Sequence, residues 1–269
     1  AHINVTANLS TGRIAADLCR YALAAGHTAL LCYGRGAAPS DIPTLRIGDT
    51  LQSPLDMAES PLRRALATVE ARLRSAAASA GVLVHAGLSR ITDRSGFYSS
   101  HTTLHFIRQL EKFQPDLVHL HNLHGYYLNL PLVIDYLRES NIPVVWTLHD
   151  CWAFTGHCAH FSYVSCDKWK SGCEKCPQTA EYPKSILRDH SFENYSRKKK
   201  AFCGVHHMTL ITPSGWLADL VGKSFLKEYP IEVVHNTIDT VAFRPIDSDF
   251  RKAYALEDKK IVLGVASAW

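Results

Sequence analysis

Short apolar runs alternate with longer segments of helical periodicity along this chain. Near the start, β-rich runs at 2–6 and 28–33 predict strands, and between them Ile14 and Leu18 recur at the spacing of a helix. Gly26 stands where that helix would end. This alternation of strand and helix is typical of βαβ units, so we predict an α/β fold built on a parallel sheet.

The rest of the chain continues the pattern. Apolar runs bounded by loop residues predict strands at 116–121, 143–149, 208–212 and 232–235. Helical patterns predict helices at 61–80, 101–113, 126–139, 192–203 and 216–225. A last apolar run, 260–266, follows a charged stretch. We therefore predict a Rossmann-like domain over residues 1–245, a connector over 246–259, and the first strand of a second, truncated domain over 260–269.

Composition narrows the class of protein. The 269 residues are 46% hydrophobic and 20% charged, which is typical of a folded globular protein. No apolar run approaches the roughly 18 residues of a membrane-spanning helix. The first residues carry no charged segment followed by an apolar core, so we predict no signal peptide and a cytoplasmic, reducing location. The net charge of +4 permits acidic partners without requiring nucleic acid.

Cysteines concentrate in residues 151–177, which we call the cysteine-rich segment. It holds five of the chain's eight cysteines, and four of them form the pattern C-x7-C-x6-C-x2-C: Cys158, Cys166, Cys173 and Cys176. The residues between them are polar, so we expect no core there and predict that a metal supplies the order. Four thiolates, two of them in a CxxC, suit one structural Zn(II). We predict such a site within an insert in the sheet domain.

Other interpretations of these cysteines stay open. Two disulfides would be the alternative in an oxidising compartment, and His157 or His160 could replace a thiolate. A redox CxxC normally opens a helix, whereas this one precedes a proline in a loop. Cys151 would be a bystander, and the remaining three, Cys19, Cys32 and Cys203, lie in apolar patterns typical of core residues.

Polar clusters follow the first and central predicted strands, where parallel sheets bind ligands. The first is NLSTGR, 8–13, a small-residue loop opening a helix, where Gly12 and Arg13 would suit a phosphate or a sugar hydroxyl. An ordinary helix cap explains the same residues. The second is HLHNLHG, in which His119 and His121 share one sheet face and Asn122 stands at the strand end. These histidines are either neutral crevice residues or metal ligands.

The third cluster is the pair His149 and Asp150, directly after the most apolar strand. A histidine there can contact a substrate hydroxyl or share charge with the adjacent carboxylate. Capping of the strand end is the structural alternative.

With these motifs in view, the chain resembles the N-terminal half of bacterial family 4 glycosyltransferases of the GT-B fold. It is most similar to the branch that includes colanic-acid and other exopolysaccharide transferases. The resemblance runs in order along nearly the whole chain, through NLSTGRIA, DLVHLHNLHGYYLN, HDCWAFTGHC, GCEKCP, ITPSGWLADLV and VVHNTIDTVAFRP.

The resemblance implies a two-domain enzyme that moves a hexose from a nucleotide sugar to a saccharide hydroxyl with retention of anomeric configuration. The acceptor would be an oligosaccharide, often linked to a lipid, and no catalytic metal is expected. Gly12 matches the position near the donor phosphate, and Arg13 follows it. His149 matches the histidine beside the transferred sugar, and Asn236 begins the N-x-x-D segment that leads into the second domain.

By the same resemblance, Asn122, Asp150 and the DRSGF loop at 93–97 would line the acceptor side. The family's main donor-binding groups lie in the second domain, so this chain alone is expected to be inactive. The basic run 197–200 is most simply a solvated helix face, although it would also suit the anionic inner face of the cytoplasmic membrane.

Two other classes of protein compete with this interpretation. A zinc-knuckle module that binds nucleic acid or a protein would explain the CxxC and the basic run. Basic and aromatic residues are not interleaved on one evident surface, so we expect no nucleic-acid partner. An epimerase related to the GT-B enzymes would share the fold and act on the nucleotide sugar itself.

Overall fold

The computed structural model describes residues 1–48, 79–262 and 264. The chain divides into two compact units, Ala1–Asn236 and Thr237–Trp269. All strands in the described part of the chain lie in the first unit, and the described part of the second unit holds one short helix, α7 (Phe250–Ala253). The domain boundaries at residues 245 and 260 stay predictions.

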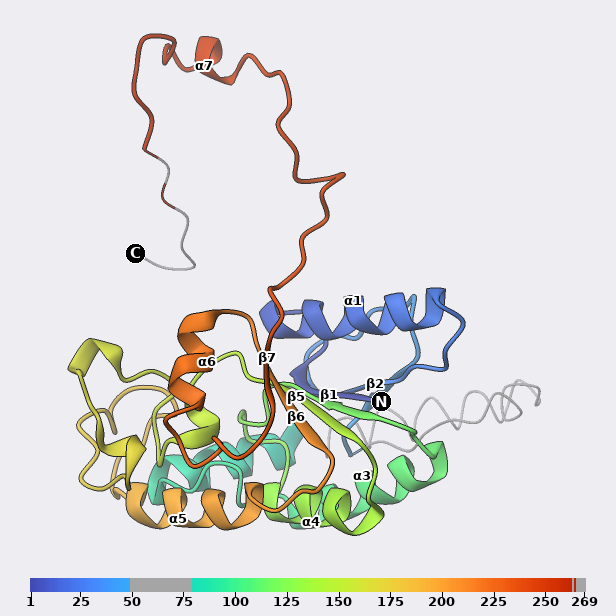
Figure 1. Ribbon diagram of the computed structural model, residues 1–269, viewed down its shortest axis with the longest axis vertical. Helices are drawn as coiled ribbons and strands as arrows, with labels where there is room; N and C mark the ends of the chain where they lie inside the picture. Colours follow the sequence, from blue (N-terminus) through green and yellow to red (C-terminus); the bar gives the residue numbers. More distant parts are fainter. Residues whose placement is uncertain (49–78, 263, 265–269) are drawn as a thin grey trace. The chain divides into compact units, whose positions relative to one another are not determined.

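The first unit is built on one parallel, Rossmann-like sheet of seven strands in the order β3-β2-β1-β4-β5-β6-β7 (Figure 1). The strands are β1 (His2–Thr6), β2 (Leu31–Arg35), β3 (Thr44–Arg46), β4 (Val118–Leu120), β5 (Val144–Thr147), β6 (Met208–Thr212) and β7 (Ile231–Val233). The chain adds β2 and β3 on one side of β1 and β4 to β7 on the other. The order therefore reverses between β1 and β4, the position at which open α/β sheets bind ligands.

Helices cover both faces of this sheet. They are α1 (Ser10–Ala24), α3 (Ser100–Phe113), α4 (Leu130–Ser140), α5 (Ser191–Phe202) and α6 (Gly215–Val221), and residues 79–92 are helical as well. α1 lies on one face, while α3, α4 and α5 lie on the other (Figure 1). Asn129 and Ser214 cap α4 and α6 by accepting backbone N–H groups with their side-chain oxygens.

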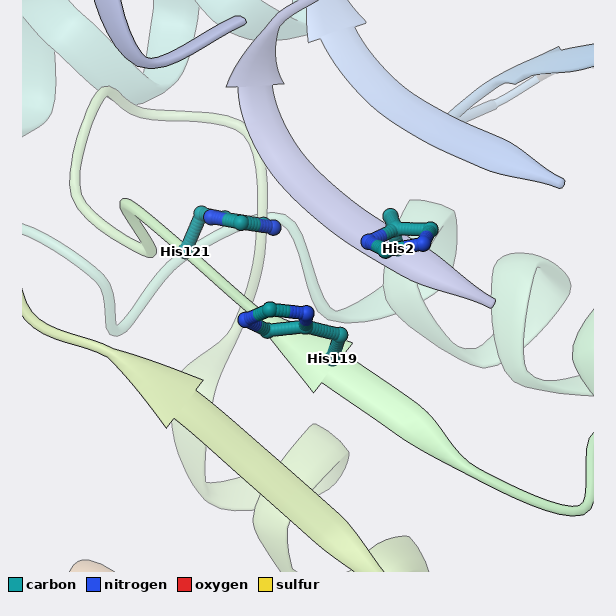
Figure 2. A group of neighbouring side chains, drawn as sticks. All are labelled: His2, His119 and His121. Carbon is teal, nitrogen blue, oxygen red and sulfur yellow. The ribbon is translucent and has the colours of Figure 1, made fainter. Parts of the chain in front are cut away.

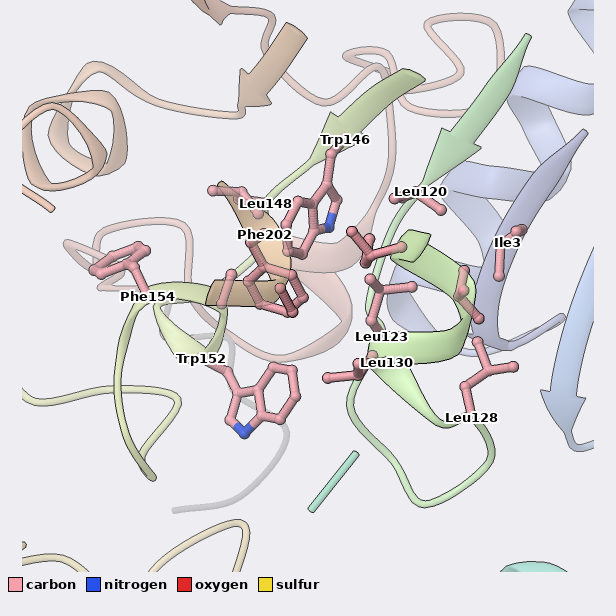
Figure 3. Packing of buried hydrophobic residues seen from close by; sticks show 14 of the residues in the cluster. Ile3, Leu120, Leu123, Leu128, Leu130, Trp146, Leu148, Trp152, Phe154 and Phe202 are labelled. Carbon is pink, nitrogen blue, oxygen red and sulfur yellow. The ribbon is translucent and has the colours of Figure 1, made fainter. Parts of the chain in front are cut away.

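The main core lies between the sheet and the layer of α3, α4 and α5. One row of register partners crosses all seven strands, and its members are Leu45, Cys32, Ile3, Leu120, Trp146, Leu210 and Ile231. Trp146 meets the ring of Phe202 from α5 edge to face, with 4.9 Å between ring centres. Figure 3 shows this packing. Burying one such side chain contributes about 1.5–3 kcal/mol, so this row anchors the strands in register.

A smaller core lies under α1. It is made of short side chains on the helix, Ala15, Ala16 and Cys19, against Leu31 and Tyr33 of β2. Short side chains let the helix lie close to the sheet, which holds the beginning of α1 beside the end of β1.

The sequence predicts most of these elements. The parallel α/β fold is confirmed, and β1 and β6 have the predicted bounds. β3 was not predicted. The predicted helix 61–80 falls almost entirely outside the described residues. The described part of the predicted strand 260–266, which is 260–262 and 264, is not in a strand; a lone apolar run forms a strand only when it has a neighbour to pair with. Among the described residues, no helix combines the length and the apolar character needed to cross a bilayer.

Candidate active site

The beginning of α1 stands at the carboxyl end of β1. We predicted a loop over residues 8–13, but α1 begins at Ser10, so Gly12 and Arg13 belong to its first turn. A Cβ atom at Gly12 would lie 2.6 Å from the carbonyl oxygen of Thr6. Glycine is therefore required for this close approach, and the backbone N–H groups of the first turn are held at the strand end.

Asn4 ties three segments together beneath this turn. Its fully buried amide donates to the carbonyl oxygen of Thr6 at 2.8 Å and to the hydroxyl of Thr11 at 3.2 Å. Its Oδ1 accepts the backbone N–H of Asn122 at 3.1 Å. This one side chain therefore fixes β1, α1 and the segment after β4 relative to one another. Sequence reasoning missed it, although a polar side chain inside an apolar strand was a usable signal.

Four histidines form a row along one face of β1, β4 and the end of β5. The rings of His119 and His121 are stacked with 4.2 Å between their centres, which confirms that they share a face. His2 lies beside both, and His149 stacks on His121 at 5.6 Å. His119 shares a 2.7 Å hydrogen bond with the hydroxyl of Thr147. Figure 2 shows three of these rings.

The row is kept neutral by its surroundings. Burial lowers the pKa of His119 to about 3 and that of His2 to about 4. Burial and its histidine neighbours lower the pKa of His121 well below its ordinary value. One ring nitrogen from each of His2, His119 and His121 lies within 4.8 Å of the others, so the metal-site alternative for these histidines stays open.

His149 occupies the end of this row, two residues after β5. Its Nε2 lies 3.3 Å from Nδ1 of His121, with which it shares a hydrogen bond. Burial lowers its pKa to about 4, although the neighbouring Asp150 opposes the shift. A neutral imidazole results at physiological pH, with one ring nitrogen bound to His121. Nδ1 is then the atom through which the ring can exchange a hydrogen bond with a ligand.

Asp150 turns away from His149 and pairs with His124. Its Oδ2 lies 2.8 Å from Nε2 of His124, and its Oδ1 accepts the backbone N–H of Trp152 at 2.9 Å. Nδ1 of His124 lies 2.8 Å from the hydroxyl of Tyr182. Burial alone would raise the pKa of Asp150, but the hydrogen bonds from His124 and Trp152 hold it below its ordinary value. An ionised carboxylate therefore anchors a chain of three side chains.

The other predicted site residues are Arg13, Asn122 and Asn236, and not all of them lie near His149. Arg13 is exposed and donates from Nε to the carbonyl oxygen of Asn8 at 3.3 Å. Asn122 is held through its backbone, whose carbonyl accepts the hydroxyl of Tyr127. Asn236 is exposed and follows β7, which is four strands from β1, or about 19 Å at the usual strand spacing. The structure thus groups Gly12, Asn122 and His149 at neighbouring strand ends and leaves Asn236 apart.

The DRSGF loop supports the cysteine-rich segment. The buried carboxylate of Asp93 is hydrogen-bonded to Nδ1 of His157 and accepts the backbone N–H of His190 at 2.9 Å. The carbonyl of Asp93 accepts the side-chain amide of Asn194 on α5. Asp93 therefore engages Nδ1 of His157, whereas the buried Nε2 has no hydrogen-bond partner among the described residues, so His157 stays an alternative ligand to one of the thiols.

The cysteine-rich segment contributes buried aromatic residues to the main core, contrary to our expectation that it would have no core. Phe154, Phe161 and Trp169 are buried, and the Phe161 and Trp169 rings stack with 4.8 Å between centres. The aromatic residues are scattered singly among polar ones, so no periodic pattern revealed them. The segment therefore buries apolar surface of its own.

The four cysteines of the pattern line one small cavity in this segment, and all eight cysteines of the chain are free thiols. A hydrogen bond from Cys176 lowers the pKa of Cys158, and the same contact raises the pKa of Cys176. Cys173 Sγ accepts the backbone N–H of Gly156 at 3.1 Å. Burial nevertheless raises the pKa of Cys173 to about 11, so of these thiols only Cys158 is shifted toward its thiolate.

Lys198 corrects our interpretation of the basic run. We took 197–200 for a solvated helix face, but Lys198 is 1% exposed. Its amino group donates to the carbonyl oxygens of Trp152 at 2.7 Å and Thr155 at 3.1 Å. It also lies 3.4 Å from the centre of the Trp152 ring. Burial lowers its pKa to about 7 against the opposing effect of Cys173 and Cys158. A buried amino group is thus placed beneath the cysteine-rich segment.

The chain belongs to glycosyltransferase family 4, whose model matches residues 11–241. That match covers β2 to β7 and the histidine row and Asn4 network described above, except for His2, Asn4 and Thr6. The chain is also 33% identical over 132 residues to a putative colanic acid biosynthesis glycosyl transferase, WcaC, of Escherichia coli (strain K12). The alignment covers 46% of this chain and 32% of that protein, so the chain spans about a third of the relative's length.

Proposed function

We propose that the protein containing this chain transfers a hexose from a nucleotide sugar to a saccharide hydroxyl, with retention, during surface polysaccharide assembly. The class of reaction, glycosyl transfer, is supported by the family match. The observation that supports its location is that α1 begins at the carboxyl end of β1 while His149 follows β5, with only β4 between these two strands and the reversal of strand order beside β1.

The first turn of α1 is our candidate for the donor's phosphate side. Gly12 permits the close approach of backbone N–H groups, and the positive end of the helix dipole favours an anion. The exposed guanidinium of Arg13 adds a positive charge at the same turn. The resemblance assigns the remaining phosphate contacts to the second domain. Asn236 begins the segment that leads into that domain.

His149 is our candidate for the group beside the transferred sugar. Because it is neutral and held by His121, it can exchange a hydrogen bond with a sugar hydroxyl without adding a charge near the developing oxocarbenium ion. No catalytic metal enters this proposal. Asp150, whose two oxygens are already engaged, would act on the site through His124.

A lipid-linked acceptor at the inner face of the cytoplasmic membrane fits the exposed surface of residues 79–92. Val84, Leu88 and Ile91 recur at helical spacing there and are exposed. Ile186, also exposed, lies alongside because its backbone N–H donates to the carbonyl oxygen of Arg90 at 2.7 Å. An apolar stripe with a basic neighbour is typical of helices that lie on anionic membranes.

We also propose that Cys158, Cys166, Cys173 and Cys176 hold one structural Zn(II). The four residues are among the lining of one cavity, but no three of their sulfur atoms lie within 4.8 Å of one another, so metal binding would draw them together. The N–H bond to Cys173 and the amino group of Lys198 would then stabilise the negative charge of a four-thiolate site. Such a site has no open position for water, so the zinc would order the segment. Elemental analysis of protein purified without chelators should give about one zinc per chain by this ligand count. Metal-free protein with two disulfides would overturn this assignment.

The transfer proposal is tested with the complete protein, UDP- and GDP-hexoses, and lipid-linked or synthetic acceptors. We expect a glycosylated product whose new bond keeps the donor's anomeric configuration, observed by NMR. Altered nucleotide sugar formed without any acceptor would instead indicate an epimerase. Salt-dependent binding of nucleic acid, with neither transfer nor donor hydrolysis, would favour the zinc-knuckle module.

A further inference from the structure

Tyr182 combines a solvent-facing ring with an anchored hydroxyl. It lies in sequence between the cysteine-rich segment and α5, and the residue is 45% exposed. Its hydroxyl lies 2.8 Å from Nδ1 of His124, and the two rings meet nearly edge to face with 5.5 Å between centres. A large aromatic side chain is thus held in one orientation while part of its surface faces solvent.

The direction of the hydrogen bonds along Tyr182, His124 and Asp150 follows from the carboxylate. Ionised Asp150 can only accept, so Nε2 of His124 carries a proton and donates it. Where Nδ1 carries no proton, it is an acceptor, and the Tyr182 hydroxyl donates to it. The hydroxyl hydrogen of Tyr182 is then engaged by His124. The lone pairs of its oxygen remain able to accept a hydrogen bond from a ligand.

The chain of side chains lies at the strand ends that carry the candidate active site. His124 follows β4, and Asp150 follows β5 directly after His149. Tyr126 and Arg35 lie close enough to Tyr182 to act electrostatically on its hydroxyl. An exposed aromatic face beside fixed polar groups is the chemistry that recognises a pyranose, which presents C–H groups on its faces and hydroxyls at its edge.

We propose that Tyr182 is a binding residue for the acceptor saccharide. Its ring packs against a sugar face, and its oxygen accepts a hydrogen bond from a sugar hydroxyl. His124 and Asp150 are positioning residues that fix the direction of this bond. The acceptor is favoured over the donor for a reason of position. The helix start that suits a phosphate follows β1, whereas Tyr182 follows the cysteine-rich segment and is bound to His124 after β4. The inference rests on the proposed transfer function and adds the acceptor subsite to it.

Direct binding of octyl β-D-glucopyranoside and octyl β-D-galactopyranoside to the complete protein tests this subsite without requiring turnover. We expect saturation-transfer NMR to show binding of at least one glycoside. Tyr182→Ala should weaken it about tenfold or more, and Tyr182→Phe, which keeps the ring, by about two- to tenfold. Tyr163→Ala is the matched control, because Tyr163 is an exposed tyrosine of the cysteine-rich segment. No binding, or binding that both Tyr182 variants leave unchanged, would overturn the proposal.

Asp150→Asn tests the positioning roles. The Trp152 N–H requires an oxygen at the position of Oδ1, so the new amide nitrogen would face His124 and reverse its tautomer. The ring would then donate to Tyr182 and occupy a lone pair of its oxygen. We expect a weaker affinity, or a higher acceptor KM with an unchanged donor KM, and no further effect of Asp150→Asn when Tyr182 is already Phe. An equal effect in both backgrounds would refute the relay.

Failure of the transfer function would look different. Glycoside binding that depends on Tyr182, without transfer or donor hydrolysis, would support the subsite and reject the reaction. Transfer with an acceptor KM that Tyr182→Ala and Tyr182→Phe leave unchanged would support the reaction and reject the subsite.

Discussion

The side-chain oxygen of Asn4 accepts the backbone N–H of Asn122 at 3.1 Å, across 118 residues of sequence. This bond joins the two strand ends between which the order of the sheet reverses. The same amide reaches the first turn of α1 through Thr11. The two loops that carry the candidate donor and acceptor residues are thus fixed by one buried polar side chain.

Replacing Asn4 with Ala should therefore lower the free energy of unfolding by about 2–4 kcal/mol, because it leaves several buried polar groups without a partner. Urea denaturation of the complete protein measures this loss. Asn8→Ala, at an exposed position in the same connection, should stay within about 0.5 kcal/mol of the original. Equal effects of the two substitutions would show that the Asn4 network contributes little.

Gly12→Ala should destabilise the fold and weaken donor binding together. The added Cβ would meet backbone atoms of Thr6 at 2.6 Å, so α1 must move away from β1. Gly87→Ala is the matched control, since nothing lies within 4 Å of its added Cβ in the helical residues 79–92. It should stabilise by about 0.4–1 kcal/mol. Unchanged stability and donor affinity in Gly12→Ala would contradict the assigned role of this turn.

The neutral histidine row predicts a loss of stability on acidification. The pKa of folded His119 is lowered to about 3, below its unfolded value near 6.5, so the unfolded state binds more protons between these values. The free energy of unfolding should fall as the pH drops from about 6.5 toward 4. His119→Gln should reduce this slope by up to about 1.4 kcal/mol per pH unit. His27→Gln, at an exposed site, should leave the slope unchanged.

Cys173→Ser should release zinc and loosen the cysteine-rich segment, if the proposed site is correct. We expect zinc per chain to fall well below one and backbone amides of 151–177 to exchange faster with deuterium. Cys203→Ala is the control, because Cys203 lies outside the segment and is only partly buried. Full retention of zinc in Cys173→Ser would exclude this thiol as a ligand.

The fold could be predicted because apolar runs and helical spacing report burial directly. Trp146 and Leu120 lie in such runs, and both are members of the central row of the core. β3 escaped prediction because only Leu45 of its three residues is buried, which leaves no pattern. The positions of His149 and Gly12 near strand ends follow from the sequence pattern, whereas their roles stay predictions.

Residues whose roles depend on distant partners could not be predicted. Lys198 sits in a basic run, and only the fold shows that it is buried against Trp152. Tyr182 is 58 residues from His124, and no local pattern links them. Such contacts depend on the tertiary arrangement of loops, which the periodicity of the sequence does not report.

The rate of sugar transfer by His149→Ala tests the central claim most directly. The complete protein, its His149→Ala variant and the exposed-site control His27→Ala are compared with the same donor and acceptor. If His149 contacts the transferred sugar, kcat/KM of His149→Ala should fall by about 100-fold or more, while His27→Ala stays within about twofold and both variants remain folded. Transfer by His149→Ala at the rate of the control would contradict the account.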